Sequence, residues 1–467
     1  MIRHKQKINF SITTTAAYML LALSVILFCF SALHLWLAEY TWHDQQRIFQ
    51  LVLLCITAPL AIFSSKTALP KQASAAVFLL LFIGILSTHA SMWPEWALKE
   101  WSRFAGLSLL VIAIGGMQLN AIHLRSLLGI MAFIGLIQAF QFLNYYLLAF
   151  ITGVYKLDTD ILVTGFSNPR SFGQFQVLLM PVMAVLIAHS LHHRKKSLVS
   201  LLALGLSFHW CIAFTLGGRG LWLGLLASHL ALLVINRKLW HIVALQAAAA
   251  LLGFVLFLLL FKLVPLWLGL DPVLRDGVRT SLSGRELIWQ WAWEMALANP
   301  WLGVGPMHYS ATYNPIAAHP HQVFLQWLAE WGVVATVIAL ALCIWGLLNG
   351  ARYLRSTSGN EMDAALWVSI VGALVLAQVD GVFVMPYTET WLALLIGLAL
   401  GRQSTTLTAP SLIQRFGCAV TAIPVLLVLG KALISEAPTL PQIIDTYTTQ
   451  YHTGLTPRFW SQGWIPM

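Results

Sequence analysis

The sequence predicts an all-α integral membrane protein that crosses the bilayer many times. Apolar residues make up 59% of the 467 residues and charged residues only 9%, whereas soluble domains carry about 25% charged residues. A chain of this composition lacks the polar side chains needed to cover a surface that faces water. Its apolar runs have the length of membrane-spanning helices, which satisfy their own backbone hydrogen bonds in lipid.

We expect 12–13 transmembrane helices. The candidate spans are 14–37, 48–65, 74–91, 104–118, 126–151, 173–191, 198–216, 220–236, 241–263, 323–349, 363–381, 387–402 and 417–434. They divide the chain into an N-terminal transmembrane bundle (1–263), a long structured loop (264–322), a C-terminal transmembrane bundle (323–434) and a tail (435–467).

The loop charges predict the orientation, because Lys and Arg gather on the cytoplasmic side. With the N-terminus in the cytoplasm, 15 Lys and Arg fall in inner segments and six in short outer segments. The six outer residues are Arg47, Lys99, Arg103, Lys156, Arg170 and Arg219. This assignment places the 264–322 loop, Asp380 and the tail on the outer face.

Composition and spacing also exclude several classes of function. The net charge of +10 comes from Lys and Arg scattered through short loops, without the basic stripe typical of nucleic-acid binding. The five cysteines lie in apolar spans and share no CxxC spacing, so neither a metal site nor a disulfide framework is indicated. No P-loop or other nucleotide-binding motif is present.

The 264–322 loop is predicted to be structured. Arg285 to Leu297 has the pattern of an amphipathic helix with Leu287, Trp291 and Met295 along one side. Ser283 followed by Glu286 fits a capping box at its start. Its tryptophans are typical of a helix that lies at the level of the lipid headgroups.

Two arginines could bind an anion at the outer face. Arg219 lies among glycines in LGGRGLWLG, where a phosphate group could approach the backbone. Arg285 begins the amphipathic helix, and a helix N-terminus attracts anions. The alternative for both is an interfacial arginine that reaches the lipid headgroups.

His319, Pro320 and His321 precede the span at 323–349 and could supply an acid or base. The alternative is a pair of solvated histidines, and two ligands alone do not make a metal site. Glu330 lies inside the span, and Asp380 interrupts the 363–402 region. Ionisable residues at membrane depth are often functional, and the alternative for each is a buried partner of an arginine.

Together these segments resemble the signature of the Wzy/O-antigen ligase superfamily. This group contains lipopolysaccharide O-antigen ligases, Wzy-type O-antigen polymerases and bacterial protein O-oligosaccharyltransferases. The resemblance is carried by GRELIWQWAWEMALANPWLGVGPMHY (284–309), AHPHQVFLQWLAEWGV (318–333), LGGRGLWLG (216–224) and GFSNPRSFGQF (165–175). One departure is Gln322, since many relatives have Asn after the second histidine.

The resemblance implies a glycosyltransferase of the bacterial inner membrane, with its active site at the periplasmic face and no metal or other cofactor. Arg219 and Arg285 would bind the pyrophosphate of an undecaprenyl-pyrophosphate-linked glycan, and His321, assisted by His319, would be catalytic. Gln322, Glu330, Arg170, Tyr309 and Asp380 are expected to support the site.

The acceptor is left open between a lipid A–core sugar and a Ser or Thr of a pilin-type protein. One alternative is a Wzy-type polymerase, whose acceptor is another lipid-linked glycan. An alternative of a different class is a transporter or flippase for lipid-linked glycans, which would use the same arginines for binding and need no histidine.

Overall fold

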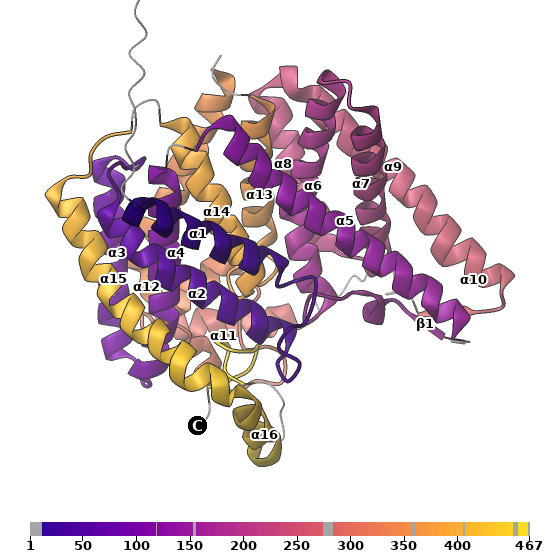
Figure 1. Cartoon of the computed structure of the whole chain (residues 1–467). Coiled ribbons are helices and arrows are strands. Elements are labelled where there is room, and N and C mark those ends of the chain that lie inside the picture. The colour runs from indigo at the N-terminus through magenta and orange to yellow at the C-terminus, as the bar shows by residue number, and fades with distance from the viewer. Residues whose placement is uncertain are drawn as a thin grey trace, which may run out of the picture.

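The computed structural model describes residues 12–117, 119–152, 156–273, 284–356, 360–404, 407–451 and 456–465. Helices dominate these residues, and two three-residue strands pair in parallel at the edge of the bundle (Figure 1). The elements are α1 (Ile12–Phe30), α2 (Trp42–Phe63), α3 (Lys71–Ala90), α4 (Pro94–Gly116), α5 (Ala121–Ile151), β1 (Lys156–Asp158), α6 (Pro169–His192), α7 (Lys196–Leu216), α8 (Arg219–Ile235), α9 (Trp240–Leu258), α10 (Val264–Trp267), β2 (Asp271–Val273), α11 (Arg285–Ala298), α12 (Val323–Arg355), α13 (Glu361–Leu376), α14 (Pro386–Gln403), α15 (Leu412–Lys431) and α16 (Leu440–Tyr451).

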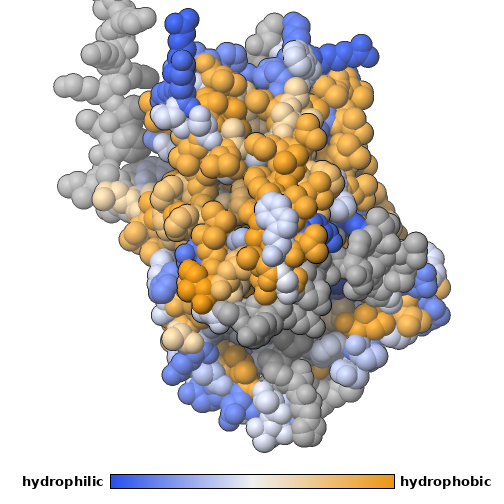
Figure 2. Space-filling view, turned by 90° about the vertical axis from the view of Figure 1, so that its right-hand side faces the viewer, coloured by the Kyte–Doolittle hydropathy of each residue, from blue (hydrophilic) through white to orange (hydrophobic). Residues whose placement is uncertain are grey.

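The protein is a helical, multi-pass membrane protein, as the composition predicts. Within the described ranges, eight helical segments are long and apolar enough to span a bilayer, fewer than the 12–13 expected. Each expected span nevertheless coincides with a helix. Five of these helices are not among the eight. The apolar part of α1 counts only as the shorter stretch Tyr18–Phe30, α8 and α13 have only 17 and 16 residues, and α4 and α14 carry charged residues. Figure 2 shows a broad hydrophobic band between hydrophilic ends.

The centre of the bundle joins helices from both halves of the chain. Helix α13 packs against α6 and α8, and α14 packs against α4. In the apolar window of α6, 89% of the residues are buried, against 22% for the segment 237–267 that contains α9. Helix α6 is therefore apolar on all sides because other helices surround it, whereas α9 lies at the periphery (Figure 1).

Three basic residues expected in outer loops lie inside helices instead, beyond the first turn. Arg47 belongs to α2, and Lys99 and Arg103 belong to α4. Arg47 and Arg103 are each 1% exposed and both pair with Glu389 of α14. The loop assignment of these two was wrong because a buried carboxylate, rather than water, neutralises their charge.

Helix α11 confirms the amphipathic helix expected at 285–297, but with a different buried face. Ile288 and Ala292 are fully buried, whereas Leu287 is 49% exposed. Gly284, with φ of +77°, occupies the N-cap position without a side-chain hydrogen bond. The cap expected from Ser283 is not tested, because Ser283 lies outside the described residues.

Helix α12 is broken at Gly332, where φ is +77°. The backbone N–H groups of Val304 and Gly305 donate to the carbonyls of Ala329 and Glu330, and the N–H of Val333 donates to Pro300. A Cβ atom at Gly332 would lie 2.2 Å from the carbonyl oxygen of Trp301. Glycine is required here, because the break lets the turn after α11 pack directly on the backbone of α12.

Candidate functional site

Three helices begin at one end of the bundle, and each carries an arginine at its start. Arg170 is the second residue of α6, Arg219 the first of α8 and Arg285 the first of α11. The turn before α8 is possible because Gly217 adopts a left-handed conformation with φ of +63°. The partial positive charge of each helix N-terminus adds to that of its arginine.

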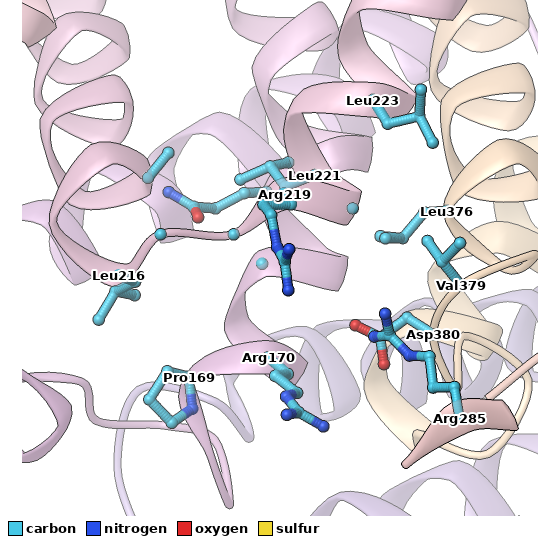
Figure 3. Close-up of a pocket in the computed structure, with 16 residues that line it drawn as sticks. Pro169, Arg170, Leu216, Arg219, Leu221, Leu223, Arg285, Leu376, Val379 and Asp380 are labelled. Atoms are coloured by element: carbon cyan, nitrogen blue, oxygen red, sulfur yellow. The ribbon is translucent and has the colours of Figure 1, made fainter. Parts of the chain in front are cut away.

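These arginines line one cavity of about 310 Å³. Asp380, which follows α13, lines it too, and the apolar side chains of Leu216, Leu221, Leu223, Leu376 and Val379 complete its wall. Figure 3 shows the side chains of Arg170 and Arg219 extending into the cavity and Arg285 reaching toward Asp380. The sequence-predicted Arg219, Arg285, Arg170 and Asp380 are thus brought together.

The cavity has an excess of positive charge. Burial lowers the pKa of Arg285; repulsion by Arg170 and Arg219 lowers it further, and attraction by Asp380 partly compensates. Three guanidinium groups and a single carboxylate line this wall, so the lining carries more positive than negative charge. Guanidinium groups form strong, charge-assisted hydrogen bonds with phosphates.

Asp380 connects the cavity to His321. The Oδ1 atom of Asp380 lies 3.6 Å from Nδ1 of His321 and accepts hydrogen bonds from Gln174 and from the N–H of Gly381. Burial alone would raise the pKa of Asp380, but His321, the Gly381 N–H and Arg170 together hold it below its usual value. Asp380 is therefore ionised at neutral pH and can orient the imidazole ring of His321.

The two histidines of the loop differ in exposure. His319 is 2% exposed, and its Nδ1 accepts a hydrogen bond from the backbone N–H of His321. Burial first, and then electrostatic repulsion involving His321, Arg458 and Arg170, lowers the pKa of His319 well below its usual value. The ring packs against Gly381, where a Cβ atom would lie 2.4 Å from Cε1 of His319. His319 is thus neutral and enclosed, whereas His321 is partly exposed.

Three further candidates lie behind the cavity rather than in its wall. The Gln322 side chain caps α12 by accepting from the N–H of Leu325. Tyr309 donates its hydroxyl proton to the carbonyl of Ile288, and its backbone N–H donates to Glu330. Glu330 pairs with Arg458 at 2.8 Å, which confirms the structural alternative considered for this acid.

Sequence reasoning missed a group of buried charges behind the site. This buried charge network consists of Arg47, Arg103, Arg458, Glu100, Glu330 and Glu389. The Glu100–Arg103 spacing on one helix face was a usable signal, since residues three apart are neighbours. Arg458 gave no comparable signal. Among the described residues, no group of His, Cys, Asp and Glu side chains is arranged to hold a metal ion.

Comparison with known proteins supports the resemblance seen in the motifs. The model of the O-antigen ligase family (Wzy_C) matches residues 200–340, a range that includes Arg219, Arg285, His319 and His321 but neither Arg170 nor Asp380. A search of curated proteins found no match. This match over residues 200–340 supports membership of the Wzy/O-antigen ligase superfamily, a family whose activity is that of a membrane enzyme of the glycosyltransferase type.

Proposed function

We propose that the protein transfers an oligosaccharide or O-antigen from undecaprenyl pyrophosphate to a hydroxyl group at the periplasmic face of the inner membrane. The observation that carries this proposal is the cavity in which Arg170, Arg219 and Arg285 face Asp380, with His321 beside that acid.

Charge complementarity supports a pyrophosphate ligand. A pyrophosphate diester between a lipid and a sugar carries two negative charges, and the cavity wall has three guanidinium groups and one carboxylate. Bond cleavage adds a third negative charge to the leaving group, so the arginines interact more strongly with the transition state than with the bound donor. Because the arginines supply this positive charge, we expect transfer to continue in the presence of EDTA.

The reaction is a single displacement at the anomeric carbon of the donor sugar. His321 accepts the proton of the acceptor hydroxyl as its oxygen bonds to that carbon. The bond between the carbon and the pyrophosphate oxygen breaks, and undecaprenyl pyrophosphate leaves with the electron pair. Asp380 orients His321 and stabilises the imidazolium that forms. His319 assists by fixing the backbone at His321.

The distribution of basic residues supports a periplasmic site. The starts of α6, α8, α11 and α12 lie at the end of the bundle that holds the cavity. Arg237, Arg352 and Arg402 lie at the other ends of α8, α12 and α14. The cytoplasmic side attracts such residues, so we assign the cavity to the opposite side and the N-terminus to the cytoplasm.

The acceptor is either a lipid A–core sugar or a Ser or Thr of a pilin-type protein. Mass spectrometry of pilin and electrophoresis of lipopolysaccharide, with and without the enzyme, distinguish the two. Formation of longer lipid-linked glycans in the absence of both acceptors would identify a Wzy-type polymerase.

The test of the proposal is a transfer assay with purified lipid-linked oligosaccharide in detergent. We expect His321→Ala to lower the turnover by about two to four orders of magnitude, the usual contribution of a general base. His34→Ala is the matched control, because His34 is exposed on the loop that follows α1. Full transfer by His321→Ala would refute the catalytic role of this histidine. Flipping of the lipid-linked glycan across vesicles without any transfer by the wild-type protein would favour the transporter alternative.

A further inference from the structure

The segment 456–465 follows the last helix and is buried beneath the site. Thr456, Phe459 and Trp460 are 0%, 0% and 2% exposed. The backbone N–H of Ile465 donates to the carbonyl of Ser310, and the carbonyl of Phe459 accepts from Arg47 at 2.7 Å. This segment, which we call the C-terminal insert, therefore packs as part of the core.

Arg458 is the charged residue at the centre of the insert, and its side chain is 1% exposed. One guanidinium nitrogen, Nη2, lies 2.8 Å from Oε1 of Glu330 and 3.2 Å from Oε1 of Glu100. The other, Nη1, donates to the backbone carbonyl of Ala318 at 3.3 Å. The planar guanidinium group thus contacts α12 through Glu330, α4 through Glu100 and the loop before α12 through Ala318.

The loop contact lies directly next to the histidines. Ala318 precedes His319, and His321 has a left-handed backbone conformation with φ of +52°. Such a conformation is unfavourable for residues other than glycine and persists only where the surroundings hold it. The carbonyl of Ala318 is held by Arg458, and the N–H of Tyr309 is held by Glu330, the ion-pair partner of Arg458.

We propose that Arg458 is a positioning residue for glycan transfer: its contact with Ala318 fixes the histidine loop so that His321 stays beside Asp380. This inference rests on the function proposed above. Arg458 lies outside the range matched by the family model, and it does not line the arginine cavity.

Positioning and general structural support have different kinetic consequences. Arg170, Arg219 and Arg285 are carried by α6, α8 and α11, whereas Arg458 binds Glu330 of α12, Glu100 of α4 and the carbonyl of Ala318. Loss of positioning should lower kcat for transfer while the KM for the lipid-linked donor stays nearly constant. Loss of general support should weaken donor binding and thermal stability together with turnover.

The decisive variant is the charge-neutral pair Arg458→Gln with Glu330→Gln, which removes both ionic groups without leaving either charge unpaired. Its matched control is Arg402→Gln with Asp363→Asn, because that pair is joined at 2.8 Å at the far end of the bundle. We expect kcat to fall at least tenfold in the first double variant, with the donor KM within threefold of wild type. The control should retain the wild-type kcat.

Arg458→Lys provides a second test of the positioning role of Arg458, and it can be used if the double variant does not fold. Lysine keeps the charge beside Glu330 but cannot also bind Ala318 through a planar fork, so we expect a several-fold lower kcat at an unchanged donor KM. Wild-type kcat in either folded variant, or a parallel loss of kcat and donor binding, would overturn the proposal. If His321→Ala is inactive while the Arg458 variants are fully active, only this inference fails.

Discussion

The protein contains two groups of three arginines that differ in their partners. The site arginines are Arg170, Arg219 and Arg285, and the buried arginines are Arg47, Arg103 and Arg458. The site arginines share a single acid, Asp380, in the cavity wall. The buried arginines are matched by Glu100, Glu330 and Glu389, at distances of 2.7–3.2 Å for the Arg47–Glu389, Arg103–Glu100 and both Arg458 pairs.

This difference indicates what each group does. A buried charge is stable only when a nearby opposite charge and hydrogen bonds replace its hydration. The buried arginines meet that condition within the protein itself, so they support other parts of the protein rather than bind a ligand. The site arginines line one cavity with a single carboxylate, and we expect that cavity to attract an anionic ligand. Charge balance therefore separates a supporting network from a binding site better than burial alone.

The largest expected effect is a loss of stability, and it should follow from removing one acid of the buried charge network. Glu389→Ala leaves Arg47 and Arg103 without their shared partner, and we expect the free energy of unfolding to fall by about 3–5 kcal/mol. Thermal unfolding in detergent measures this loss. A melting midpoint equal to that of the wild type would mean that the two arginines do not depend on Glu389.

Removal of a site arginine should affect activity and leave stability intact. For Arg285→Ala we expect turnover to fall by about 10²–10³-fold, the usual effect of removing one donor to a developing charge. The melting midpoint should stay the same or rise slightly, because repulsion by Arg170 and Arg219 is relieved. A stability loss comparable to that of Glu389→Ala would contradict the division into two groups.

A smaller effect is expected at Asp380, the acid that lines the cavity with the arginines and lies 3.6 Å from His321. The pKa of the Asp380 carboxyl is lowered in the folded protein. Its ionised form therefore stabilises the folded state fully at pH values above the unfolded pKa of about 4, and this stabilisation is lost as the pH falls through the lower folded pKa. The melting midpoints of wild type and Asp380→Asn should therefore differ most at neutral pH and converge in acid. We also expect kcat to fall about tenfold or more. If the melting midpoints of the two proteins differ by the same amount at every pH, ionisation of Asp380 is not the cause of that difference.

The smallest effect is expected at the far end of the bundle. The Arg402–Asp363 pair is partly exposed, with 24% of the arginine side chain accessible, and such pairs contribute about 1 kcal/mol or less. Arg402→Gln should lower the melting midpoint only slightly and leave transfer unchanged. A large loss of transfer would indicate coupling between the two ends of the protein.

Local sequence patterns predicted the helices and two of the arginines that line the cavity. They could not predict ion pairs between residues that are far apart in the sequence. Arg219, Arg285 and His321 each lie in a recognisable local motif, and apolar length located the helices. Arg47 was assigned to a loop because it precedes the most apolar part of its helix, and its partner Glu389 lies 342 positions away. The role of Arg458 depends on tertiary packing and has no local signature. The sequence left open whether Glu330 is a functional residue or a partner of an arginine, because its partner, Arg458, belongs to the C-terminal insert.

The position of the C-terminal insert in the chain has a consequence for biosynthesis. Residues 456–465 are translated after every helix of the bundle, yet Arg458 and Ile465 bind the backbone at Ala318 and Ser310. Chains generally fold from the N-terminus as they are synthesised, so the helices that carry the arginines enter the membrane first. The contacts of Arg458 and Ile465 with the region that carries the histidines can form only after the insert has been translated, which is later than the translation of α6, α8 and α11.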